Sequence, residues 1–140
     1  MGLSPFAEPA SGFLAAHRLV RTLEEHSAIW TRKVIVAAPD PRISAPTFIE
    51  VSIALETRTG RKGVLLWESM LRQSGIAIEP FTERQAFLAR QAFSDYGKGR
   101  HPAGLSFGDC FSYALAKATG EPLLFRGDDF RKTDVIPALP

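Results

Sequence analysis

The sequence predicts an α/β fold, with a mostly parallel sheet flanked by helices on both faces. Short apolar segments, such as residues 76–78 and 123–125, alternate with longer segments of helical periodicity. Glycine and proline residues stand at many of the boundaries, where turns are expected. Apolar residues make up 45% of the 140 residues and charged residues 23%, which is typical of a folded chain. We therefore expect one domain over residues 1–140.

The first forty residues have the weakest pattern. Residues 1–12 are rich in proline, glycine and serine and are expected to form a loop. Residues 13–29 show a loose helical pattern. Residues 33–38 are either a buried strand or the end of a helix, and a Pro-Asp-Pro turn follows at 39–41.

The pattern sharpens after this turn. Residues 42–45 are expected to be extended, and residues 48–55 begin an apolar helix that ends near Gly60. A second helix is expected over 62–73, with Gly75 stopping it. Its buried face is predicted to contain Val64, Leu65, Trp67, Met70 and Leu71.

A short strand at 76–78 is expected to end before Pro80. Thr82 and Gln85 have the spacing of a capping box, which predicts a helix from there to about Tyr96. The inner side of this helix is predicted to contain Phe87, Leu88, Ala92 and Phe93.

The last third of the chain predicts another helix and strand. A basic, glycine-rich loop at 97–102 precedes a helix that starts at Asp109 and ends at Gly120. Apolar residues recur along it with helical spacing, at Phe111, Ala114, Leu115 and Ala118. Residues 123–125 are expected to form a strand, and 135–136 a last edge strand.

Composition excludes several classes of protein. The single cysteine, Cys110, rules out an internal disulfide framework and a multi-cysteine zinc site, and it fits a reducing cytosol. The formal net charge of +2 is too small to predict nucleic-acid binding by itself. No apolar run approaches the roughly 20 residues of a membrane span, and the N-terminus lacks the pattern of a secretory signal. We therefore expect a cytoplasmic protein.

Three acids stand where sites form in parallel sheets, at helix starts or just after strands. Glu50 lies one turn into the helix after the strand at 42–45, Asp109 lies at a helix start, and Asp128 follows the strand at 123–125. Carboxylates brought together repel one another unless a cation or protons intervene. Oxygen ligands suit Mg²⁺ or Mn²⁺, so the pattern indicates a metal site.

Each acid also has an ordinary structural interpretation. Asp109 is in a place where an aspartate commonly caps a helix, and residues 127–129 have the composition of a turn. Glu50 is different, because its neighbours are apolar and a carboxylate in such surroundings needs a partner.

Other reactive side chains give weaker signals. Cys110 with His101 as its base would make a nucleophile, but a small buried thiol is the simpler interpretation. The three histidines lack the spacing of metal ligands. Lys98 and Arg100 could meet phosphates or simply belong to a solvated loop.

Three segments together resemble the PIN-domain ribonuclease toxins, the VapC-like half of bacterial type II toxin–antitoxin pairs. They are APTFIEV at 45–51, GDCFSYALA at 108–116 and LFRGDDF at 124–130. The resemblance runs from about Ala37 to the C-terminus. It implies a parallel sheet flanked by helices, and an acidic cluster that binds Mg²⁺ or Mn²⁺ and cleaves RNA, often tRNA or another structured RNA.

The resemblance also assigns roles to residues. It makes Glu50, Asp109 and Asp128 the acids that hold the metal or orient the attacking water, with Asp129 as a structural neighbour. It implies a cognate antitoxin that occupies the crevice, and a homodimer. Lys98, Arg100 and Arg126 are candidates for RNA phosphates on charge alone.

Residues 1–35 depart from the family pattern. The family begins with an apolar strand that ends in an aspartate, of the form V-[IV]-D-[AST]-S-A. Residues 1–12 have only Glu8, and Pro5 and Pro9 argue against a central strand around it. We therefore expect reduced affinity for Mg²⁺ and an incompletely formed sheet.

Two alternatives to an active ribonuclease toxin stay open, and the missing aspartate favours the first of them. The first is a catalytically inactive PIN-like module that still binds the antitoxin. The second is a receiver-like domain in which an aspartate at a strand end accepts phosphate, although no strand carries the expected early acidic pair.

Overall fold

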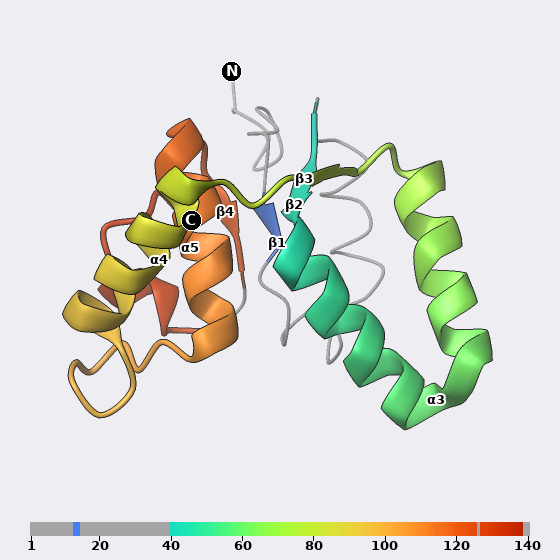
Figure 1. Ribbon diagram of the computed structural model, residues 1–140, viewed down its shortest axis with the longest axis horizontal. Coiled ribbons are helices and arrows are strands. Elements are labelled where there is room, and N and C mark those ends of the chain that lie inside the picture. The colour runs from blue at the N-terminus through green and yellow to red at the C-terminus, as the bar shows by residue number, and fades with distance from the viewer. Residues whose placement is uncertain (1–12, 15–39, 126, 139–140) are drawn as a thin grey trace, which may run out of the picture.

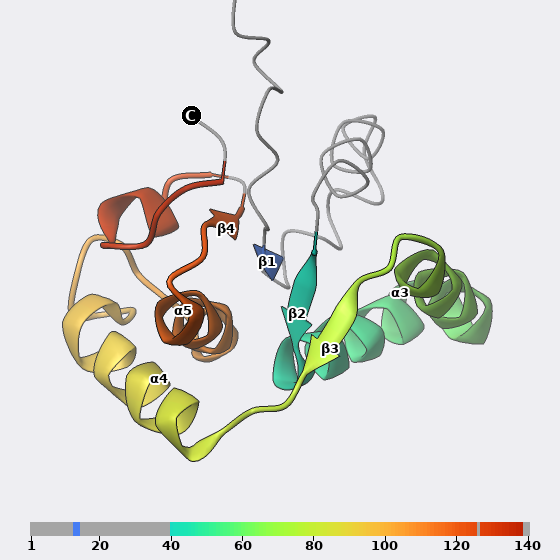
Figure 2. The same cartoon turned by 90° about the horizontal axis from the view of Figure 1, so that it is seen from above.

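The computed structural model describes residues 13–14, 40–125 and 127–138. A parallel sheet of four short strands lies between helices (Figure 1). The strands are β1 (Phe13–Leu14), β2 (Arg42–Ser44), β3 (Ala77–Glu79) and β4 (Leu123–Leu124), in the order β3-β2-β1-β4. The helices are α3 (Ala45–Gln73), α4 (Glu83–Tyr96), α5 (Phe107–Thr119) and the 3₁₀ turn η1 (Phe130–Lys132). Figure 2 shows α4 and α5 on one side of the sheet and the second half of α3 on the other, so the predicted α/β class is confirmed.

The central strand β1 corrects two expectations. Phe13 pairs with Arg42 of β2 and with Leu123 of β4, and Leu14 pairs with Leu124. The helix predicted from residue 13 is therefore wrong for these two residues. The expected gap in the sheet is wrong as well, because β1 lies between β2 and β4. Pairing with strands on both sides outweighs a loose local periodicity. The rest of the predicted helix, residues 15–29, and the apolar segment at 33–38 lie outside the described residues.

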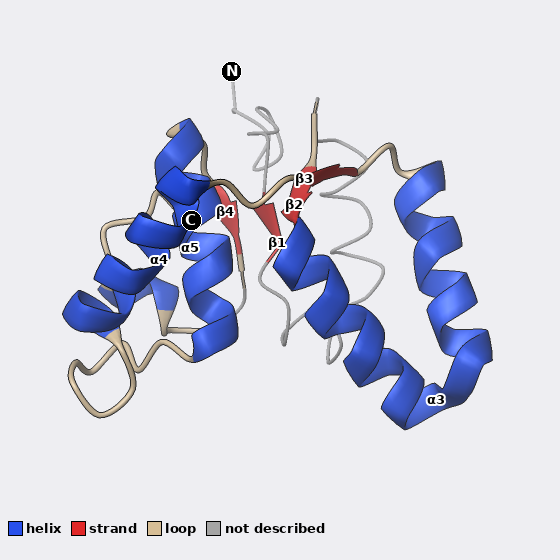
Figure 3. Cartoon of the chain, in the orientation of Figure 1, coloured by secondary structure: helices blue, strands red, loops and turns tan. Residues whose placement is uncertain are grey.

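Helix α3 is one element with two arms, residues 45–59 and 61–73. Figure 3 shows the bend between the two arms. Gly60 lies between them with φ 73° and ψ −172°, a backbone conformation that favours glycine. The two predicted helices are confirmed, although the first begins at Ala45 rather than Phe48. Leu65, which was expected in the buried face, is exposed, while Trp67 and Leu71 are buried as expected.

Helix α4 confirms its predicted cap and part of its predicted inner side, because Ala92 is buried and Leu88 packs against the core. The Thr82 side chain accepts a hydrogen bond from the Gln85 N–H, as the capping-box spacing requires. The expectation that Phe87 and Phe93 face inward is wrong, because their side chains are 62% and 41% exposed. The buried stripe contains Gln85, Ala89 and Ala92. Phe87, two residues from both Gln85 and Ala89, falls on the opposite side of the helix.

Helix α5 packs against α4, α3 and three strands, and it places the candidate site. It begins at Phe107, with Ser106 as its cap and Asp109 as its third residue, so Asp109 is not the cap itself. Gly120 ends it in the left-handed conformation, as predicted. The predicted strand at 135–136 is displaced by one residue, because the bridge to Leu123 forms at Pro137.

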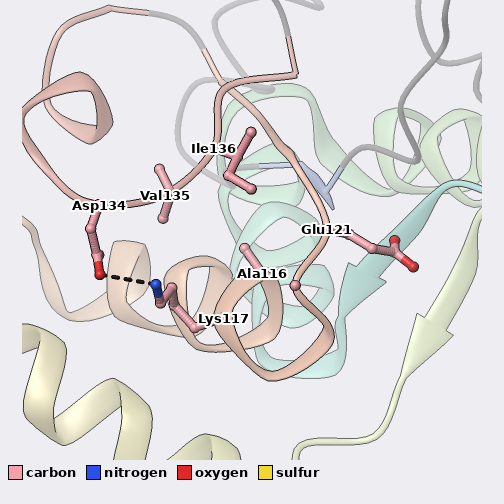
Figure 4. A pocket seen from close by; sticks show the side chains of 7 residues that line it. Ala116, Lys117, Glu121, Asp134, Val135 and Ile136 are labelled. Carbon is pink, nitrogen blue, oxygen red and sulfur yellow. Dashed lines mark hydrogen bonds and ion pairs between the residues drawn. The ribbon is translucent and has the colours of Figure 1, made fainter.

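The C-terminal segment is held to α5 through Asp134. The Tyr113 hydroxyl donates to one Asp134 carboxylate oxygen at 2.6 Å. The Lys117 ammonium donates to the other oxygen at 2.9 Å, as Figure 4 shows. Burial alone would raise the pKa of Asp134, but these two hydrogen bonds outweigh it and lower that pKa below its ordinary value.

We expect this arrangement to make stability depend on pH. A carboxyl group whose pKa is lowered by folding stabilises the protein above its ordinary pKa, and the stabilisation is lost as the pH falls through the lowered value. The free energy of unfolding of the wild type should exceed that of Asp134→Asn at pH 7, by less than about 1 kcal/mol because the pair is exposed to solvent. Urea unfolding of both proteins at pH 7, 5 and 3 measures this difference. A difference that stays constant down to pH 3 would contradict the assignment.

Within the described residues, none of the helices combines the length and the apolar character needed to cross a membrane.

Candidate active site

The three predicted acids lie at the same edge of the sheet. Strand β2 ends at Ser44, and Glu50 follows in the first arm of α3. Strand β4 ends at Leu124, and Asp128 follows. The last turn of α5 leads through Gly120 into the amino end of β4. The first turn of α5, which contains Asp109, therefore lies toward the carboxyl ends of the strands. All strands are parallel, so this edge is the one where their carboxyl ends meet.

Glu50 is held against the first turn of α5. Its side chain is half-buried, and its carboxylate lies so close to Gly108 that a Cβ atom there would overlap both carboxylate oxygens. Only glycine leaves this space without a shift of the neighbours. Glu50 is therefore brought next to the residue that precedes Asp109.

Asp109 is part of the start of α5. Its side chain is 2% exposed, and its Oδ2 accepts the Ser106 N–H at 2.9 Å. In return the Asp109 N–H donates to the Ser106 hydroxyl at 3.2 Å, which completes a capping box. The capping interpretation is thus confirmed, while the metal interpretation stays a prediction.

A buried pair of hydroxyl groups lies one helical turn from these acids. The Thr47 and Ser112 hydroxyl oxygens are 3.2 Å apart and join α3 to α5. Sequence reasoning missed both residues and the space at Gly108. Their spacing could have indicated them, because Thr47 lies three residues before Glu50 and Ser112 lies three residues after Asp109. Residues three apart share a face of a helix.

Asp128 lies apart from Glu50 and Asp109. It is exposed, in the turn before η1, and its carbonyl oxygen accepts the Arg131 N–H at 3.1 Å. Among the described residues, no three histidine, cysteine, aspartate or glutamate side chains form a group that could hold a metal ion. The structure thus brings Glu50 to the turn that contains Asp109, and it leaves Asp128 in solvent at the same edge.

The carboxyl end of β1 has no acid in the sequence. Ala15 and Ala16 follow Leu14, and the first acid after them is Glu24. At the neighbouring end of β2, the Ser44 hydroxyl is buried and makes no hydrogen bond with the described part of the chain. This end of the sheet therefore contains a polar atom in need of a partner.

The donors at this edge fit a hard divalent cation. Mg²⁺ is commonly held by one or two carboxylates, with water and substrate phosphates completing its octahedron. Glu50 and Asp109 supply that number of carboxylates, and no soft ligand is involved. By the chemistry of its donors this edge fits a hard divalent metal ion.

The alternative with a cysteine nucleophile is not supported by the surroundings of that cysteine. Burial, and then the charge of Asp109, raise the pKa of the Cys110 thiol to about 11, so the thiol stays protonated at neutral pH. The Nδ1 atom of His101 accepts the Ala103 N–H at 3.0 Å. Both residues therefore have structural roles, while His17 and His26 lie outside the described residues.

A small cavity of about 50 Å³ lies at the other end of α5. It is lined by Ala116, Lys117, Gly120, Glu121, Asp134, Val135 and Ile136 (Figure 4). At about 1.5 Å per residue, Gly120 is roughly 16 Å along the helix from Asp109. This cavity has room for little more than a water molecule or two and is separate from the acids.

The family assignment follows from comparison with known proteins. The profile described as "PIN domain" matches residues 13–136, from β1 to the last described segment. The chain belongs to the PIN-domain family. Its match begins at Phe13, the residue that the structure places in the central strand.

Within this family the chain is VapC-like. It is 44% identical over 115 residues to "Ribonuclease VapC42" of Mycobacterium tuberculosis (strain ATCC 25618 / H37Rv), which covers 81% of this chain and 88% of that protein. It is 47% identical over 100 residues to "Ribonuclease VapC" of Mycolicibacterium smegmatis, covering 70% of this chain and 78% of the relative. A similar match, 43% over 99 residues, is found with "Ribonuclease VapC30" of Mycobacterium tuberculosis, covering 70% and 76%.

Proposed function

We propose that this VapC-like chain is a divalent-metal-dependent endoribonuclease and the toxin of a type II toxin–antitoxin pair. The observation that supports it most is the contact of the Glu50 carboxylate with Gly108, beside Asp109. The relatives named ribonuclease favour the enzyme over the inactive module and over a phosphoacceptor domain.

In this proposal Glu50 and Asp109 hold Mg²⁺ or Mn²⁺, and Asp128 completes the acidic edge. When bound, such a metal lowers the pKa of water and stabilises the charge that develops on a phosphodiester. Asp109 is kept in place by the capping box, and Glu50 by its seat on Gly108. Asp128 is exposed, and the charge of a bound metal ion would attract its carboxylate toward the other two acids.

Basic residues close to the start of α5 in the sequence are candidates for contacts with the RNA phosphates. Lys98 and Arg100 are exposed in the loop before α5, and the Arg100 guanidinium lies 5.6 Å from the centre of the Phe93 ring. Arg126 lies outside the described residues. We assign these three cations to phosphate contacts, which position RNA without reading its sequence.

The partner in the pair is a cognate antitoxin, and the substrate is RNA, for which we propose tRNA or another structured RNA. Helix α3 exposes apolar side chains that a protein partner would cover, namely Ile49, Ile53, Leu65 and Leu66. Ile49 and Ile53 flank Glu50 in the sequence, so an antitoxin seated there would also reach the acids. We further propose that the chain forms a homodimer.

Cleavage of RNA by the purified chain tests the proposal. Total tRNA is incubated with the protein in Mg²⁺ or Mn²⁺, with EDTA, and with EDTA followed by excess metal. We expect cleavage that EDTA abolishes and added metal restores. A folded chain that leaves tRNA and other structured RNA intact in both metals would contradict the enzymatic proposal.

One variant distinguishes two explanations for a chain without activity. The chain is either a PIN domain that lost one catalytic aspartate, or not a ribonuclease at all. Ala15 directly follows β1, where the family has its aspartate, so Ala15→Asp supplies the missing carboxylate. We expect this variant to cleave RNA faster than the wild type at low Mg²⁺, while the matched Ala15→Asn does not. Cleavage by Ala15→Asp alone would support the inactive-module alternative for the natural chain.

A further inference from the structure

We propose that the buried hydroxyl pair of Thr47 and Ser112 positions Glu50 and Asp109 for metal binding. The two are positioning residues, because they act through the acids rather than touching the metal. The inference rests on the proposed metal site and adds to it the feature that sets the spacing of its two carboxylates.

Burial makes this hydrogen bond hard to replace. The side chains of Thr47 and Ser112 are 0% and 1% exposed, and their oxygens are 3.2 Å apart. A buried hydroxyl that loses its partner loses free energy, since water cannot take the place of that partner. Each hydroxyl group therefore favours the relative placement of the helices that keeps the other within reach.

The spacing of the pair couples it to both acids. Residues three apart lie on the same side of a helix, so Thr47 and Glu50 share a face of α3, and Asp109 and Ser112 share a face of α5. The seat of Glu50 on Gly108 confirms that these two faces meet. The helices α3 and α5 thus meet at two neighbouring contacts, one helical turn apart. The first joins Thr47 to Ser112, and the second joins Glu50 to the turn that contains Gly108 and Asp109.

A hydrogen bond at this contact does what apolar packing does not. Apolar side chains tolerate small slides and rotations of one helix on another, whereas a hydrogen bond weakens steeply with distance and angle. A rotation of α3 about its axis would move Glu50 off Gly108 and would separate the hydroxyl oxygens as well. The Thr47–Ser112 hydrogen bond thus fixes how α3 packs on α5, and through this packing it fixes the separation of the Glu50 and Asp109 carboxylates.

Thr47→Val tests the inference, because valine keeps the shape of threonine and removes its hydroxyl. We expect Thr47→Val and Ser112→Ala each to weaken Mn²⁺ binding by about 10- to 100-fold, as losing a group that orients metal ligands commonly does. The double variant should weaken binding by less than the product of the two single effects, because the two changes share the Thr47–Ser112 hydrogen bond. Thr47→Ser, which keeps the hydroxyl, should stay within about threefold of the wild type.

The measurement is a calorimetric titration with Mn²⁺, beside circular dichroism and urea unfolding to show that each variant is folded. Thr57→Val is the matched control, because the Thr57 hydroxyl is on the same helix but bonds to the Ile53 carbonyl at 2.9 Å, away from α5. The Thr57 variant should bind Mn²⁺ as the wild type does. No RNA is needed, so the result is independent of cleavage.

The outcomes separate the inference from the proposed function. Wild-type binding of Mn²⁺ that a folded Thr47→Val or Ser112→Ala variant retains would overturn the positioning role alone. Equal weakening by Thr47→Ser would also overturn it, since the hydroxyl would then not be the feature that matters. Absence of Mn²⁺ binding by the wild type and by Asp109→Asn alike would overturn the metal site and this inference together.

Discussion

Asp109→Asn is expected to lower the rate of metal-dependent RNA cleavage by at least about 100-fold and to weaken Mn²⁺ binding in parallel. The change removes one of two carboxylate charges at the proposed site, and groups that stabilise developing charge in a reaction are commonly worth that much. Asparagine is nearly the same size, and its amide oxygen can still accept the Ser106 N–H, so the start of α5 should be preserved.

The readouts are initial rates of tRNA cleavage at fixed Mn²⁺, Mn²⁺ affinity, and the free energy of unfolding without metal. Asp95→Asn is the matched control, because Asp95 is an exposed acid of α4 that accepts a hydrogen bond from the neighbouring Gln91. It should leave rate and affinity unchanged. An Asp109→Asn variant that cleaves at the wild-type rate would remove Asp109 from the chemistry and leave it only its role in the capping box.

Gly108→Ala is expected to have the second largest effect, and its sign should depend on Glu50. The added Cβ would overlap both Glu50 carboxylate oxygens, so the side chain or the helix must move. The overlapping atoms are the far end of a half-buried, flexible side chain, so the loss of unfolding free energy should lie at the lower end of the about 1–3 kcal/mol that crowding commonly costs. We expect that loss together with at least about a tenfold weaker affinity for Mn²⁺.

In a Glu50→Ala background the same substitution should no longer be harmful. The overlapping carboxylate is gone, and alanine is preferred over glycine within a helix by up to about 1 kcal/mol. Urea unfolding of the four proteins in this cycle, all without metal, measures the reversal. Equal destabilisation in both backgrounds would mean that a different neighbour restricts position 108, and that Glu50 is not seated there.

Local chemistry was enough to predict most elements after residue 40. The caps at Thr82 and Gly120, and the break at Gly60, depend on side-chain hydrogen bonds or on glycine conformations that act within a few residues. The three acids were also predicted from their places beside strands and helix starts, and this assignment stays a prediction. A parallel sheet fixes which edge such places share, whatever the details of packing.

Long-range pairing decided what the sequence pattern could not. Phe13 and Leu14 are a strand only because β2 and β4 offer them hydrogen-bonding partners from far along the chain. Phe87 is exposed because α5 packs on the other side of α4, against Ala89 and Ala92. Apolar character alone does not say which side of a helix its neighbour will cover.

The sequence by itself thus determined the α/β class, the family resemblance and the identity of the candidate acids, because these follow from residue types and short spacings. Only the tertiary structure decided where the candidate acids lie relative to their neighbours. It seated Glu50 on Gly108, joined Thr47 to Ser112 in the interior, and left Asp128 in solvent. The physical reason is that contacts between α3 and α5 join residues about 60 positions apart, and their energies appear only when the two helices pack together.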